Sequence, residues 1–118
     1  MDSAKRTVTL TVVPRDELAA RMDAALAGRR TEPRIAFASV DLLHRICSPK
    51  RLAILRMMAG EGPLPVREVA RRVGRDVKAV HRDMAALVDA GLLDRGEGGR
   101  MSFPYDGVRM EVDLMRAA

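Results

Sequence analysis

The stretch that decides the fold is residues 66–106, which read VREVARRVGRDVKAVHRDMAALVDAGLLDRGEGGRMSFPYD. Its first eight residues place apolar side chains three and four positions apart, the spacing of one helix face: Val66, Val69, Ala70 and Val73. Gly74 follows, and glycine adopts the positive φ of a sharp turn without steric penalty. The helical spacing then resumes, so the stretch predicts two short helices joined by a tight turn.

The second helix is expected to run from about Asp76 to Ala90. Its expected buried residues recur with helical period: Val77, Val80, Met84, Leu87 and Val88. The small Ala70, the turn residue Gly74 and the branched Val80 have the spacing of a helix-turn-helix, in which the two helices pack closely. Because helical pairs also occur as plain packing units, this spacing predicts the motif without proving a role for it.

A helical wheel places the long cations of the second helix opposite its apolar stripe, on the face that holds Arg75, Lys78, Ala79, Arg82 and Ala86. Small alanines between cations allow a helix to lie deep in a DNA major groove, which is about 12 Å wide. Arg75, Lys78 and Arg82 are therefore candidates for base or phosphate contacts. His81 lies nearer the stripe, so a partly buried or phosphate-contacting role is favoured over base readout.

Two strand-like segments, 92–95 and 100–105, follow this helix and are joined by the turn sequence GEGG. Arg95 and Arg100 flank the turn, where they could reach a phosphate or the minor groove. A hairpin directly after a recognition-type helix is typical of the wing of a winged helix-turn-helix. The expected class is α+β, mostly helical with a β-hairpin wing and an N-terminal strand-helix extension.

Residues 48–106 resemble the winged helix-turn-helix of bacterial and archaeal regulators of the MarR/ArsR-like type. The segments SPKRLAILRMMAGEGPLPVREVARRVGRDVKAVHRDMAALVDAGLL and GGRMSFPYD are similar to a family of small DNA-binding transcriptional regulators, some of which are regarded as antitoxins. The resemblance implies a dimeric repressor whose recognition helix follows Gly74. Pro65 departs from the pattern, since such domains often have a Ser or Thr there that forms a capping box with Glu68.

The N-terminal part is expected to be a strand-helix extension. Residues 7–13 alternate apolar and polar side chains, which predicts a half-buried strand. A helix is expected from Pro14 to Gly28, with one apolar stripe: Leu18, Met22, Ala25 and Leu26. Ser39 is expected to cap a short helix ending at Cys47, and Ser48 with Pro49 to begin the next helix, residues 50–59.

Two units are therefore predicted. Residues 1–47 form the extension that mediates dimerisation or partner binding, and residues 48–118 form the DNA-binding domain. The second unit ends in an alternating strand whose apolar residues are Val108, Met110, Val112 and Leu114. Strands with one apolar face need a packing partner, which favours a homodimer over a monomer whose extension folds back on its own domain.

Charge supports a polyanionic partner. The 118 residues carry a formal net charge of +5. Residues 67–82 hold six Lys or Arg and two carboxylates, so most of the excess lies in one short stretch. A solvated basic helix is the alternative. Aromatic residues are scarce, with no Trp, one Tyr and two Phe, which argues against base stacking on single strands.

Little in the sequence indicates catalysis or cofactors. His44 and Cys47 are three residues apart, but a structural zinc site needs four ligands, so ordinary helix positions are the favoured interpretation. We expect no enzyme activity, no cofactor and no metal. The lone cysteine, together with the absence of an apolar run near 18 residues and of a signal-peptide pattern, predicts a cytoplasmic protein without membrane association.

The leading hypothesis is a dimeric, sequence-specific regulator of transcription that binds double-stranded DNA and represses its own gene. The alternative is an antitoxin that binds and neutralises a toxin protein, with DNA binding as autoregulation. The two roles are compatible, because DNA would contact residues 48–118 and a protein partner the N-terminal segment.

Overall fold

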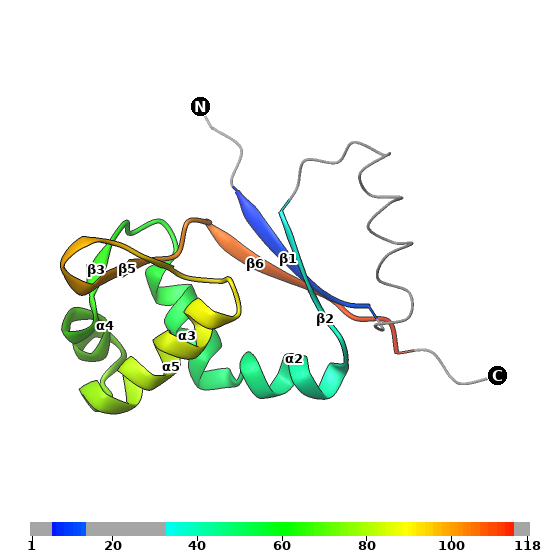
Figure 1. Cartoon of the computed structure of the whole chain (residues 1–118), viewed down its shortest axis with the longest axis horizontal. Helices are drawn as coiled ribbons and strands as arrows, with labels where there is room; N and C mark the ends of the chain where they lie inside the picture. Colours follow the sequence, from blue (N-terminus) through cyan, green and yellow to red (C-terminus); the bar gives the residue numbers. More distant parts are fainter. Residues whose placement is uncertain (1–5, 14–32, 115–118) are drawn as a thin grey trace.

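The computed structural model describes residues 6–13 and 33–114 (Figure 1). The described residues form an α+β fold with four α-helices and two three-stranded sheets. Along the chain the elements are β1 (Thr7–Val12), β2 (Arg34–Phe37), α2 (Val40–Ile46), α3 (Pro49–Met58), β3 (Leu64–Pro65), α4 (Val66–Val73), α5 (Val77–Asp89), β4 (Asp94–Arg95), the 3-10 turn η1 (Glu97–Gly99), β5 (Arg100–Ser102) and β6 (Gly107–Glu111). The helix expected from Pro14 to Gly28 lies outside the described residues.

The first sheet has the order β2-β1-β6, and both of its strand pairs are parallel. Thr9 is level with Arg34 of β2 and with Arg109 of β6. Val8 and Leu10 are fully buried in the central strand. The strand expected at residues 7–13 is confirmed. The last strand, β6, ends at Glu111, so Val112 and Leu114 lie beyond it. Because β6 pairs with β1, the first sheet joins residues from both sides of the boundary that was expected after residue 47.

The helices begin where the sequence places their caps. The Ser39 hydroxyl accepts a hydrogen bond from the Leu42 N–H at 3.1 Å, at the start of α2. The Ser48 hydroxyl accepts from the Arg51 N–H at 3.3 Å, and a proline opens α3. Asp76 caps α5 in the same way. These side chains satisfy backbone donors that have no partner within the helix, and the predicted starts of α2 and α3 are confirmed.

The second sheet is antiparallel, with the order β3-β5-β4. The predicted hairpin is confirmed as β4 and β5, but its strands are shorter than expected. Leu92 and Leu93 are buried before β4 begins. β3 was not expected: Leu64 lies level with Met101, so the segment before α4 adds a third strand to the hairpin.

The core is shared by the four helices and both sheets, and α5 contributes Val80, Met84 and Leu87 to it. Val77 was expected to be buried, and this is wrong, because 44% of it is exposed. It is the first residue of α5, next to the Gly74 turn and one helical turn before the packed Val80. Val88, also expected to be buried, is half-buried at the edge of the core.

In the part of the chain that the structure describes, every helix is too short or too polar to cross a bilayer.

Candidate nucleic-acid interface

The turn between α4 and α5 is fixed by Gly74. Its φ of 71° and ψ of 39° lie in the left-handed region, which other residues rarely adopt. The carbonyl of Ala70 accepts hydrogen bonds from the N–H groups of Gly74 at 2.9 Å and of Arg75 at 3.1 Å. Ala70 and Val80 are both buried. The packing predicted from the spacing of Ala70, Gly74 and Val80 is therefore confirmed.

Arg75 does not lie on the open face of α5. Its Nη2 atom donates to Oδ2 of Asp83 at 2.8 Å, and 23% of its side chain is exposed. The wheel placed it wrongly because Asp76, with φ of −61° and ψ of 137°, is extended and breaks the helical phase between Arg75 and α5. The second terminal nitrogen of Arg75, Nη1, is buried without a hydrogen-bond partner among the described residues.

Asp83 connects three elements and was not identified from the sequence. Its Oδ1 atom accepts from Nε of Arg51 on α3 at 3.0 Å, while its Oδ2 atom binds Arg75. Arg51 also donates to the carbonyl oxygen of Ile46 at the end of α2, at 3.1 Å. Burial raises the pKa of Asp83, but hydrogen bonds and charges of Arg75 and Arg51 outweigh it and hold this pKa below its usual value. An acidic residue midway along α5, directly after Arg82, was the signal for this role.

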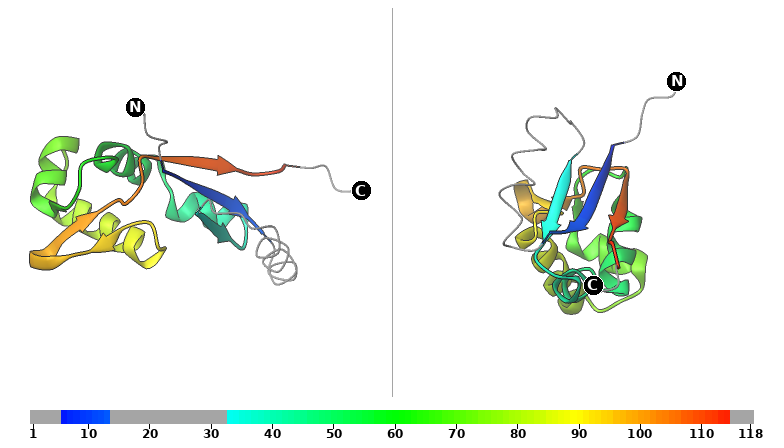
Figure 2. Two further views of the ribbon diagram at one scale, coloured as in Figure 1. Left: turned by 90° about the horizontal axis from the view of Figure 1, so that it is seen from above. Right: turned by 90° about the vertical axis from the view of Figure 1, so that its right-hand side faces the viewer.

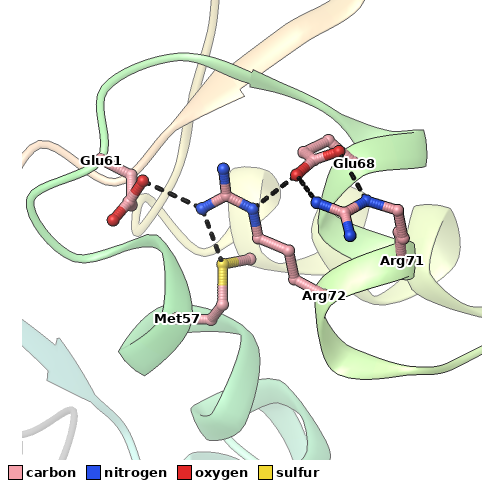
Figure 3. A network of polar contacts seen from close by, with 5 residues as sticks. All are labelled: Met57, Glu61, Glu68, Arg71 and Arg72. Carbon is pink, nitrogen blue, oxygen red and sulfur yellow. Dashed lines mark hydrogen bonds and ion pairs between the residues drawn. The ribbon is translucent and has the colours of Figure 1, made fainter.

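Two further cations of the basic stretch are paired with carboxylates (Figure 3). Glu68 accepts from Nε of Arg71 at 3.0 Å and from Nε of Arg72 at 2.7 Å. Arg72 also donates to Glu61 at 2.9 Å and reaches the sulfur of Met57 at 3.8 Å. The hydrogen bonds from Arg71 and then Arg72 lower the pKa of Glu68 to about 2. The charges of Arg71 and Arg72 are thus neutralised locally by Glu68 and Glu61. Pro65 has no side-chain hydroxyl to form a capping box, and Glu68 binds these two arginines instead.

The remaining predicted contact residues are accessible on α5 and on the hairpin. Lys78, His81 and Arg82 are exposed on α5, and Ala79 is half-buried beside them, as is Ala86. The expectation that His81 is partly buried is therefore wrong, and its phosphate-contacting role stays a prediction. Arg95 and Arg100 are exposed on either side of η1. Within residues 6–13 and 33–114, the four Lys and Arg side chains of this group form no ion pair.

These cations lie at one end of the molecule. In Figures 1 and 2, α4, α5 and the β4–β5 hairpin cluster on the side away from the parallel sheet β2-β1-β6. The Gly96 N–H donates to the carbonyl oxygen of Arg100 at 2.8 Å, which closes the hairpin and fixes Arg95 and Arg100 on adjacent strands. This end of the molecule therefore holds both the exposed cations of α5 and the two exposed arginines of the hairpin.

His44 and Cys47 do not combine into a ligand set. His44 is exposed on α2, whereas Cys47 is buried at its end. Burial raises the pKa of the Cys47 thiol, and the charge of Arg51 only partly opposes this. No three His, Cys, Asp or Glu side chains of the described residues are close enough together to hold a metal ion.

Comparison with known proteins gives one family. Searches of curated proteins and of solved structures found no match for the chain. The HVO_A0114 family model matches residues 46–110, from the end of α2 into β6. That match spans more than half of the 118 residues and includes α3, α4, α5 and the hairpin. The chain therefore belongs to the HVO_A0114 family.

Proposed function

We propose that the protein is a sequence-specific regulator of transcription that binds double-stranded DNA as a dimer through a winged helix-turn-helix. The observation that carries the proposal is that α5 has one side packed in the core and one side exposed. One side packs into the core through Val80, Met84 and Leu87, while Lys78 and Arg82 stand exposed on the other. The antiparallel β4–β5 hairpin also supports it, since a hairpin directly after a recognition-type helix is typical of a wing.

In this proposal α5 lies in the major groove. Lys78 and Arg82 contact base edges or adjacent phosphates, and the small Ala79 permits close approach. Arg95 and Arg100 of the hairpin contact the backbone or the minor groove. Arg75 acts differently from the other cations: it positions α5 through Asp83, so its loss should affect the fold before it affects recognition.

Removing the recognition cations tests the proposal. The Lys78→Ala/Arg82→Ala variant is expected to bind DNA from upstream of its own gene at least about thirtyfold more weakly than the parent protein. Each good base contact contributes roughly 1–3 kcal/mol, and both residues lie away from the core. Gel-shift titration measures the affinity, and circular dichroism verifies that the helix content is unchanged.

The matched control is Arg45→Ala/Lys50→Ala, which removes the same charge from exposed positions on α2 and α3. It should bind DNA nearly as tightly as the parent. Equal binding by the parent and by the Lys78/Arg82 variant would exclude this face of α5 as the recognition surface.

The hairpin makes a separate, electrostatic prediction. Arg95→Ala/Arg100→Ala should weaken binding to all duplexes and reduce the slope of log affinity against log salt by about one for each phosphate that the protein no longer neutralises. The titration is repeated at several salt concentrations on a cognate and an unrelated duplex. A slope equal to that of the Arg45/Lys50 control would place the hairpin away from the DNA.

A further inference from the structure

The parallel sheet has an open edge at β6. β6 pairs with β1 on one side, and no described strand lies on its other side (Figure 2, right). The apolar Met110 and Leu114 are 39% and 80% exposed on this segment, and Arg109 and Glu111, on either side of Met110, are also exposed. Unpaired peptide groups beside exposed apolar side chains are a template for another strand.

A groove opens beside the same edge, between α3 and β6. Its volume is about 390 Å³. Leu52 and Leu55 line it from α3, Val108 and Met110 line it from β6, and Asp106 lies just before that strand. An apolar groove that continues to a strand edge offers one surface both for backbone pairing and for an apolar side chain.

We propose that β6 of a second copy covers this edge. The two strands run antiparallel around a twofold axis at Met110, and the two three-stranded sheets become one sheet of six strands. Such an interface is isologous, because each copy uses the same surface. This inference rests on the dimer of the proposed function and names its interface, and it does not depend on DNA binding.

The sequence of β6 is self-complementary at this register. With Met110 opposite the partner's Met110, Arg109 lies opposite the partner's Glu111, and the same pair recurs by symmetry. Val108 likewise lies opposite the partner's Val112. Shifting the pairing by two residues in one direction sets Arg109 against the partner's Arg109, and in the other direction Glu111 against the partner's Glu111. Like charges directly opposite on neighbouring strands are destabilising, so the charge pattern selects one register.

At the same register, the exposed Leu114 of each copy packs against the groove of the other. The partner's Leu114 comes level with Asp106, beside Val108, at the end of the groove that these residues line. Glu111 already accepts from Arg34 of β2 at 3.3 Å. Because β2 lies on the far side of β1 from the open edge, Glu111 exchanges this exposed contact for the partner's Arg109 when the dimer forms, and an exposed ion pair contributes little stability to begin with.

Charge exchange between two variants tests the proposal. The full-length protein is expected to sediment at tens of micromolar as twice its 13.0 kDa mass. Arg109→Glu and Glu111→Arg each set like charges against each other at both symmetry-related positions. Each variant alone should self-associate at least about tenfold more weakly. An equimolar mixture should recover the dimer, because a chain with two acidic residues then faces a chain with two basic ones.

Recovery in the mixture also excludes misfolding as the reason for dissociation, since misfolded chains do not reassemble. Lys50→Glu, an exposed charge reversal on α3, should remain dimeric. A monomeric parent protein would overturn the proposal, as would two single variants that dimerise like the parent. The experiment contains no DNA, so its outcome is separate from that of the Lys78/Arg82 titration.

Discussion

Replacing Val80 with Asp is expected to leave the protein unfolded at neutral pH. Val80 is fully buried where α5 packs in the core. An unpaired carboxylate at that position must lose its hydration or expel α5 from the core, and either costs several kcal/mol. Domains of this size are stable by only about 5–15 kcal/mol, so one such group removes a large part or all of that stability.

Val77→Asp is the matched control, on the same helix and with the same chemical change. Val77 is exposed at the first position of α5, where a carboxylate interacts favourably with the helix dipole. Thermal melts followed by circular dichroism should show a cooperative transition near that of the parent protein for Val77→Asp and none for Val80→Asp. A normal melt for Val80→Asp would contradict the packing of α5 described above.

Asp83→Asn is expected to destabilise the protein by about 2–3 kcal/mol at neutral pH. The side chain of Asp83 is 14% exposed and is the shared anion of Arg51 and Arg75. Removing one partner from a fully buried ion pair costs about 3–5 kcal/mol, and partial access of water to these side chains reduces that figure. Urea unfolding measures the loss. Asp89→Asn, exposed on the same helix, should change stability little.

The effect of Asp83→Asn should shrink at low pH. Because the folded-state pKa of Asp83 is lower than its ordinary value of 3.8, its stabilisation is fully present above that value. It disappears as the pH falls through the lower folded-state pKa. The two proteins should therefore approach each other in stability below about pH 4. Glu68 also titrates there, but it does so in both proteins and cancels in the difference. A constant difference at all pH values would show that the charge of Asp83 is not responsible.

Features set by local chemistry could be predicted from the sequence. Ser39 and Ser48 supply capping hydroxyls to backbone donors within three residues. Gly74 supplies the left-handed turn, and Val80 lies where the helical period requires an apolar residue. Each of these depends on a few neighbouring residues, so the sequence carries the whole signal.

Features set by distant partners could not be predicted in this way. β3 is two residues long, Leu64 and Pro65, and becomes a strand only because β5 lies alongside it. The parallel neighbours of β1 come from residues 34–37 and 107–111, and nothing in the alternation of Val8 and Leu10 specifies them. Arg75 was misplaced because the wheel extended the helical phase past Asp76, whose backbone is extended.

The central position of β1 has a consequence for how the protein is synthesised. The N–H of Arg6 donates to the carboxylate of Asp106 at 2.9 Å across 100 residues of chain. The ribosome therefore releases β1 long before β6, whereas α3, α4, α5 and the hairpin follow one another and can fold as they emerge. A nascent chain halted before Gly107 presents Val8 and Leu10 beside an unfilled strand position, as the kind of extended apolar segment that chaperones bind.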